Sequence, residues 1–202
     1  GESLFLNYPT YTAGEGFPAC TCISVNETIV HGIPGSRRIA DGDLVSVDCG
    51  VRLEGWCADA AITVPVGRVD VTWMRMLETA NAILDEAIAM VRPGRRWSDI
   101  ATRMERMAAD AGHGIGRRLH EPPQAPGFVT PSFLREQDFT LRPGMVIAIE
   151  PMLTLSGGRD GADSIELGDG WTVVTADGSP AVHVEHTVAV VRGGAEVLTD
   201  GR

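Results

Sequence analysis

Alternating apolar and polar positions predict strands in several parts of the chain. In residues 44–51, Val45, Val47, Cys49 and Val51 share one face of such a strand, and Ser46 and Asp48 share the other, because successive side chains of a strand point to opposite sides. The same pattern predicts strands at 56–66, 145–154 and 181–191, and two short strands within 22–31 around a turn at Asn26-Glu27.

Spacings of three and four residues predict two helices. Over residues 71–91 one apolar stripe is formed by Leu77, Ala80, Leu84, Ala87 and Val91, and the following Pro93-Gly94 is a stop signal. A second helix is expected near 98–111, with Ser98 as its N-cap and with Ile100, Met104, Met107 and Ala108 facing inward. Strands and helices together predict an α/β (α+β) fold.

Composition excludes several classes of protein. The 202 residues suit a single domain over 1–202, and the net charge of −10 argues against nucleic-acid binding and against docking on anionic membranes. No apolar run is long enough for a transmembrane helix, and no signal peptide precedes the first strand. Cys20, Cys22, Cys49 and Cys57 match neither a zinc ribbon nor a redox pair. We therefore expect reduced thiols and a cytoplasmic location.

Four carboxylates stand within or beside the apolar strand segments: Asp48, Asp59, Glu150 and Glu185. A single acid in a strand commonly faces solvent, but four in such settings suggest a shared role. Buried carboxylates must be paired or bound to a metal ion, and none of the 17 Lys and Arg residues lies within these strand segments. The pattern indicates a metal site.

His113 adds a nitrogen donor to this set. It stands in Gly112-His113-Gly114, where the small neighbours leave room around the imidazole. Four carboxylates and one imidazole suit a divalent ion such as Mn, Fe, Co or Zn and are too many for one tetrahedral zinc. Two ions that share bridging carboxylates and a water molecule would use all five ligands.

Six segments, in this order and over nearly the whole chain, resemble the type I methionine aminopeptidases. They are GFPACTCISVNETIVHGIP (16–34), DGDLVSVDCG (41–50), GHGIGRRLHEPP (112–123), LRPGMVIAIEPM (141–152), DGWTV (169–173) and VEHT (184–187). The resemblance implies the pita-bread fold, in which two pseudo-symmetric halves surround a bent antiparallel sheet. It also implies a metalloaminopeptidase that removes the N-terminal methionine from nascent proteins.

The resemblance assigns a metal-binding role to five residues. Asp48 matches a ligand of one metal ion, and His113 and Glu150 match ligands of the other. Asp59 and Glu185 match the two carboxylates that bridge the ions. Glu150 would also act catalytically by accepting a proton from the attacking water.

Five other residues are implied to handle the substrate. His31 and His120 match the histidines that position the substrate peptide and stabilise the oxyanion. Phe17, Cys22 and Trp171 match the walls of the methionine pocket, where aromatic and sulfur groups suit a thioether side chain. The alternative for these three residues is ordinary core packing.

Alternation also separates two further histidines. His183 shares a face with Glu185 and is a candidate to support the ligands from behind, whereas His186 is expected on the opposite face.

The chain departs from the family pattern in a few places. The helices that open the family's fold are missing before residue 16, which predicts an exposed apolar surface on the sheet. A strand that precedes Gly112 in the family is also missing, so His113 is expected to be less well aimed. Gly14 and Leu119 stand where the family often has aromatic residues, which predicts a wider methionine pocket.

The resemblance further implies a monomer that meets its N-terminal Met substrates at the ribosome. Two other hypotheses stay open at this point. One is a pita-bread binding module that has lost its metal ions and its activity, and the other is an Xaa-Pro peptidase of the prolidase or aminopeptidase P type.

Overall fold

A computed structural model gives the fold of residues 1–9, 16–107, 110–155 and 164–201, and within 110–114 it describes the backbone and the side chain of His113. The strands are β1 (Glu2–Ser3), β2 (Cys22–Val25), β3 (Thr28–Val30), β4 (Leu44–Leu53), β5 (Trp56–Pro65), β6 (Asp110–Gly114), β7 (Glu121–Gln124), β8 (Val146–Thr154), β9 (Ser164–Glu166), β10 (Val173–Thr175), β11 (Ala181–His183), β12 (Glu185–Val191) and β13 (Gly194–Val197). The helices are α1 (Val71–Met90), α2 (Trp97–Met107) and α3 (Pro131–Glu136).

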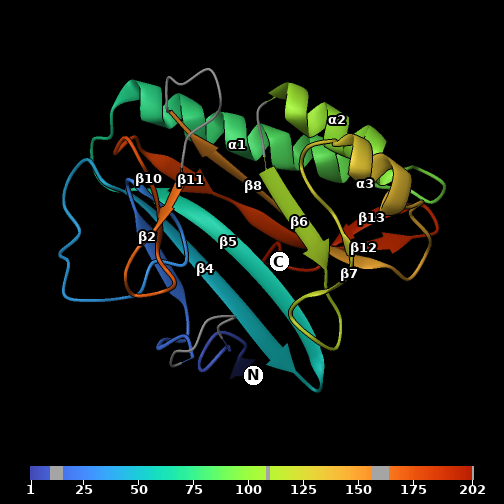
Figure 1. Cartoon of the computed structure of the whole chain (residues 1–202), viewed down its shortest axis with the longest axis horizontal. Helices are drawn as coiled ribbons and strands as arrows, with labels where there is room; N and C mark the ends of the chain where they lie inside the picture. The colour runs from blue at the N-terminus through green and yellow to red at the C-terminus, as the bar shows by residue number, and fades with distance from the viewer. Residues whose placement is uncertain (10–15, 108–109, 156–163, 202) are drawn as a thin grey trace.

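Ten strands form one antiparallel sheet in the order β1-β4-β5-β12-β8-β6-β7, to which β2, β11 and β13 attach at the sides. The long, curved β4–β5 hairpin occupies one part of it (Figure 1). A small second sheet has the order β3-β10-β9. The five strands β4, β5, β12, β8 and β6 are thus successive neighbours, although their order along the chain is different.

Helices α1 and α2 lie across one side of this sheet (Figure 1). Asp70 caps α1 by accepting a hydrogen bond from the amide of Thr72, and the buried stripe includes Ala80 and Ala87, whose small side chains allow the helix to pack closely on β8 and β11. The predicted stripe is confirmed. No described helix has both the length and the apolar character needed to cross a membrane.

The second predicted helix is shorter than expected. It begins at Trp97, so that Ser98 lies inside the helix and is not its N-cap, and it ends at Met107. Ile100 and Met104 are buried as predicted, while Ala108 lies outside the described residues. Residues 110–114 form β6, which pairs with β8. The expectation that no strand would precede and aim His113 was therefore wrong.

The two faces of the β4–β5 hairpin differ in an unexpected way. The face of β4 that carries the polar residues Ser46 and Asp48 is the buried one, and Val51 on the opposite face is partly exposed. On β5, Ile62 and Val64 share that outer face and are 57% and 42% exposed. An exposed apolar surface was predicted, and the outer face of this hairpin confirms it.

Candidate metal centre and active site

Five adjacent strands each contribute one metal-competent side chain to the same side of the sheet. In spatial order the residues are Asp48 on β4, Asp59 on β5, Glu185 on β12, Glu150 on β8 and His113 on β6. The pairing of Asp48 and of Glu185 with Ala61 places both acids beside the same point of β5. Segments that are far apart in the sequence thus converge because antiparallel pairing fixes which positions are level with one another.

Donor atoms within this group are close together. One oxygen of Asp59, one nitrogen of His113 and one oxygen of Glu185 all lie within 4.8 Å of one another. The Nε2 atom of His113 lies 3.6 Å from Oε1 of Glu150. Such separations allow the donors to bind common cations.

Three of the acids are buried, and some of their oxygens have no hydrogen-bond donor in the part of the chain that the structure describes. Asp48, Asp59 and Glu185 are 8%, 5% and 2% exposed, and Oδ1 of Asp48 and Oε1 of Glu185 accept no hydrogen bond from any described residue. Burial, followed by the charge of Asp59, raises the pKa of Asp48 to about 9. Burial likewise raises the pKa of Asp59 to about 6 and that of Glu185 well above its usual range.

Glu150 behaves differently from the other three acids. Its burial acts to raise its pKa, but His183 and His113 lower it further, so that the net pKa lies below the ordinary value. Glu150 is therefore ionised near neutral pH, while Asp48 and Glu185 hold protons in the absence of a cation. The Asp48, Asp59 and Glu185 cluster is suited to a positive partner.

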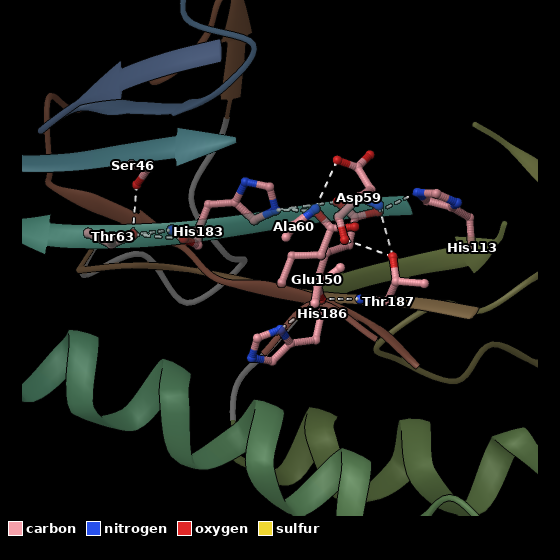
Figure 2. A network of polar contacts seen from close by, with 11 residues as sticks. Ser46, Asp59, Ala60, Thr63, His113, Glu150, His183, His186 and Thr187 are labelled. Atoms are coloured by element: carbon pink, nitrogen blue, oxygen red, sulfur yellow. Dashed lines mark hydrogen bonds and ion pairs between the residues drawn. The ribbon is translucent and has the colours of Figure 1, made fainter. Parts of the chain in front are cut away.

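Hydrogen bonds fix the backbone beneath the cluster. The hydroxyl of Thr187 on β12 accepts from the amide of Asp59 at 2.9 Å and donates to the carbonyl of Asp59 at 2.7 Å. Figure 2 shows His113 and His183 on opposite sides of the acidic group, and His186 turned away toward the helices. The expected position of His186 is confirmed, since its Nδ1 lies 2.9 Å from the hydroxyl of Thr199.

Two exposed histidines, His31 and His120, line a cavity together with these acids. Burial lowers the pKa of His120 to about 4, and Nδ1 of His120 lies 2.7 Å from the hydroxyl of Tyr8. Burial also lowers the pKa of His31, although the residue as a whole is exposed. Both imidazoles are therefore neutral at physiological pH and can offer hydrogen bonds without carrying a charge.

The backbone at His31 is shaped by its neighbour. His31 has a φ of 57°, which is uncommon for a residue with a side chain. A Cβ at Gly32 would collide with the carbonyl oxygen of Ile23, and the amide of Gly32 donates to the hydroxyl of Ser24. This close approach holds the turn after β3 and directs His31 into the cavity.

The three predicted pocket residues, Phe17, Cys22 and Trp171, form an apolar wall of the same cavity. The rings of Phe17 and Trp171 meet edge to face at 5.2 Å, and Phe5 packs against Phe17 at 6.3 Å. Burial, followed by the charge of Asp48, raises the pKa of the Cys22 thiol, so that it is a neutral wall and not a nucleophile. The whole cavity has a volume of about 430 Å³.

All ten residues singled out from the sequence line this one cavity: Phe17, Cys22, His31, Asp48, Asp59, His113, His120, Glu150, Trp171 and Glu185. Sequence reasoning missed Phe5, Tyr8 and Gln124, which also line it. Tyr8 and Phe5 lie in an irregular segment without periodicity, and only their contacts in the folded chain identify them.

Comparison with known proteins agrees with this geometry. The family model of metallopeptidase family M24 matches residues 6–192. The chain therefore belongs to metallopeptidase family M24.

Particular relatives narrow this class. A methionine aminopeptidase of Treponema pallidum is 45% identical over 201 residues, covering 92% of this chain and 74% of that protein. The crystal structure of methionine aminopeptidase from Thermotoga maritima matches with a TM-score of 0.87 at 37% identity, covering 98% of this chain and 78% of that one. Within family M24 the chain is grouped with the methionine aminopeptidases and has their pita-bread fold.

A prolidase from Pyrococcus horikoshii is also similar, with a TM-score of 0.69 at 22% identity over 89% of this chain and 47% of that one. At this identity the likeness concerns the fold alone.

Proposed function

We infer that this chain is a metal-dependent aminopeptidase that removes the N-terminal methionine from polypeptides. Its relatives bear that name over most of its length. The observation that carries the inference is the cavity itself. Five metal-competent side chains gather in it, and aromatic rings and a neutral thiol form an apolar wall beside them.

We propose that the site holds two divalent ions, which could be Co, Mn, Fe or Zn. The donor set fits such ions, because buried carboxyl oxygens lack hydrogen-bond donors and no Arg or Lys is among the described residues that line the cavity. Asp48, Asp59, His113, Glu150 and Glu185 would hold them. When bound, the ions would supply Lewis acidity and a water molecule of lowered pKa.

Proton transfer and substrate binding are assigned to residues of the chain. Glu150 is the proposed proton acceptor, since its lowered pKa keeps it ionised near pH 7. His120 and His31 are proposed to donate hydrogen bonds to the substrate peptide as neutral imidazoles. Because Tyr8 contacts Nδ1 of His120, the Nε2 atom is the nitrogen left for the substrate.

The side chain of the first substrate residue is proposed to lie against Phe17, Cys22 and Trp171. These groups are apolar and polarizable, and a methionine thioether forms favourable contacts with aromatic rings. Leu119 also lines the cavity, where its smaller side chain is expected to widen the pocket.

The proposed substrates are nascent proteins with an N-terminal Met, met as they emerge from the ribosome. The proposal of a monomer working in the cytoplasm is consistent with this role. A peptide assay tests the core of the function directly. Metal-free protein is incubated with Co or Mn and with Met-Ala-Ser, and free methionine is measured; Leu-Ala-Ser serves as the matched control.

We expect methionine release from Met-Ala-Ser with little cleavage of the control peptide. A folded, metal-loaded sample that releases no methionine would contradict the proposal. Near-zero metal content after reconstitution would favour a binding module instead. Faster cleavage of Xaa-Pro peptides than of Met-Ala peptides would favour the prolidase type.

A further inference from the structure

His183 lies beside the proposed ligands but has no task in the reaction outlined above. It ends β11, it is 3% exposed, and it lies on the same side of the sheet as Glu185. Its Nε2 atom is buried and makes no hydrogen bond with any described residue. A buried imidazole nitrogen directed at acids without a hydrogen bond calls for a chemical explanation.

The distances around this nitrogen resemble those between two ligands of one ion. Nε2 of His183 lies 3.4 Å from Oε2 of Glu150 and 4.0 Å from Oε2 of Glu185. Donor atoms of these three residues all lie within 4.8 Å of one another. Ligands bound at about 2.1 Å with angles near 90–110° stand about 3.0–3.4 Å apart, so the separation from Glu150 matches this range and the separation from Glu185 is longer.

The two histidines of the cluster are placed alike with respect to Glu150. His113 faces one carboxylate oxygen at 3.6 Å, and His183 faces the other at 3.4 Å. Figure 2 shows the two rings approaching the acidic group from opposite sides. An ion position next to His113 therefore has a counterpart next to His183, and each combines one imidazole with two carboxyl groups.

The backbone of His183 is held firmly in this place. The Thr63 hydroxyl on β5 accepts from the amide of His183 at 3.0 Å and donates to its carbonyl at 2.8 Å. The Ser46 hydroxyl on β4 lies 2.7 Å from the same Thr63 oxygen. Two neighbouring strands thus fix the residue before any ion binds, as a ligand requires.

The Nε2 atom of His183 faces two carboxyl groups, at 3.4 Å and 4.0 Å, and forms no hydrogen bond with either. A cation between the three donors would bind this nitrogen and the buried acids together. We propose that His183 is a sixth metal ligand, the nitrogen donor of a metal position formed with Glu150 and Glu185. This inference rests on the proposed function and adds a residue to its metal centre.

The consequence is a choice of metal. A position with an imidazole donor favours Zn and Co over Mn more strongly than a position made of carboxylates alone. The test uses the full chain with 15N-labelled histidine. Zinc is titrated into the metal-free protein, and the ring nitrogens of the five histidines are followed by NMR. We expect Nε2 of both His113 and His183 to take the shift of metal-bound nitrogen by two equivalents.

Variants give an independent measurement. His183→Gln is expected to weaken zinc binding at one position by more than about 100-fold and manganese binding by less than about 10-fold. His186→Gln is the matched control, because this neighbouring histidine contacts Thr199 on the other face, and its metal affinities should equal those of the wild type. Should His183→Gln fail to fold, the NMR titration of the wild type decides alone.

The outcomes separate this inference from the proposed function. If two zinc ions bind while His183 keeps an Nε2–H and only His113 shifts, His183 is a positioning residue and the inference is overturned. The proposed function would then stand. If no zinc binds to the folded protein at all, both fail.

Discussion

The hydroxyl of Tyr8 lies 2.7 Å from Nδ1 of His120, which is 112 residues away in the sequence. This contact orients an imidazole that we propose to bind the substrate. Replacing Tyr8 with Phe removes the hydrogen bond and keeps the ring. We expect kcat/KM for Met-Ala-Ser to fall about fivefold, the equivalent of one hydrogen bond of about 1 kcal/mol.

Metal affinity is the control in this experiment, and calorimetric titration should give the wild-type value for Tyr8→Phe. A change in metal affinity as large as the change in kcat/KM would show that the substitution disturbs the whole site and not the orientation of His120.

Cys22 and Cys20 form a natural pair for testing the cavity wall. Cys22 is buried and has a raised pKa, whereas Cys20 is exposed. Because the thiolate is the reactive form, we expect iodoacetamide at pH 7.5 to label Cys20 at least about 100-fold faster than Cys22 in the folded protein. Peptide mass spectrometry resolves the two sites. Equal rates would mean that the Cys22 thiol is open to solvent.

At the scale of single residues, the sequence predicted the chemical role of a side chain better than it predicted which residues that side chain contacts. Alternation along one strand placed His183 on the face of Glu185, and this was confirmed. Its approach to Glu150 depends on the pairing of β11 and β12 with β8, which no local pattern determines. Tyr8 was missed for the same reason, since its partner lies in a distant loop.

The first turn of α2 depends on a residue from outside the helix. Oδ1 of Asp138 accepts from the amide of Ser98 at 3.1 Å, and Oδ2 accepts from Nε of Arg96 at 2.8 Å. The carboxylate thus satisfies a free amide of the helix start, as an N-cap does. We expect Asp138→Ala to lower the free energy of unfolding by about 1–2 kcal/mol, measured by urea denaturation.

Asp99 provides the matched control for this substitution. It lies in the same turn and makes an exposed pair with Arg95 at 3.5 Å, which contributes little. Asp99→Ala should therefore change the stability by less than about 0.5 kcal/mol. Equal losses for the two variants would contradict the capping role of Asp138.

The two predicted helices show what periodicity can and cannot determine. The stripe of α1 and its stop at Pro93-Gly94 are local signals, and the prediction was accurate. For α2 the sequence offered Ser98 as the cap, but the structure uses Asp138, which is 40 residues away. The predicted end at 111 was wrong because pairing with β8 draws residues 110–114 into a strand.

The outer face of the β4–β5 hairpin exposes several large apolar side chains. Leu53 and Trp56, which are opposite one another at the hairpin end, are 63% and 58% exposed, and Ile62 and Val64 continue this face. Contiguous apolar surface of this kind favours association. We expect Ile62→Thr with Val64→Thr to reduce binding of a hydrophobic dye and concentration-dependent association in sedimentation experiments.

Threonine keeps the β-branched shape that suits a strand, and both positions face away from the cavity. The double variant should therefore keep the metal affinity of the wild type and its stability within about 0.5 kcal/mol. Unchanged dye binding would show that this face is not the exposed apolar surface in solution.

At the scale of the molecule, the motifs carried most of the prediction. Their order identified the fold. All ten predicted site residues line one cavity, because the strand topology determines which positions lie next to one another. Burial was harder to predict. The polar face of a strand usually points to solvent, but the polar face of β4 is buried. The reason is that a functional site lies against that face.

The burial of acids on this face has a measurable consequence for stability. In the metal-free fold the pKa of Asp48 is raised to about 9 and that of Glu185 is raised well above its usual range. Between pH 7 and 8.5 the folded protein therefore holds protons that the unfolded chain has already lost. Unfolding releases them, so the free energy of unfolding falls as pH rises, by at most about 1.4 kcal/mol per pH unit for each proton held.

This pH window lies above the range in which the lowered pKa values of His31, His120 and His186 affect stability. We expect the melting temperature of the metal-free protein to fall from pH 7 to 8.5, and Asp48→Asn to flatten that slope. Bound zinc should remove the slope, because binding displaces the same protons, and its stabilising effect should be larger at pH 8.5 than at pH 7. A metal-free melting temperature that rises over this range would mean that Asp48 and Glu185 are already ionised, and the cation would then be balancing existing charge instead of replacing protons.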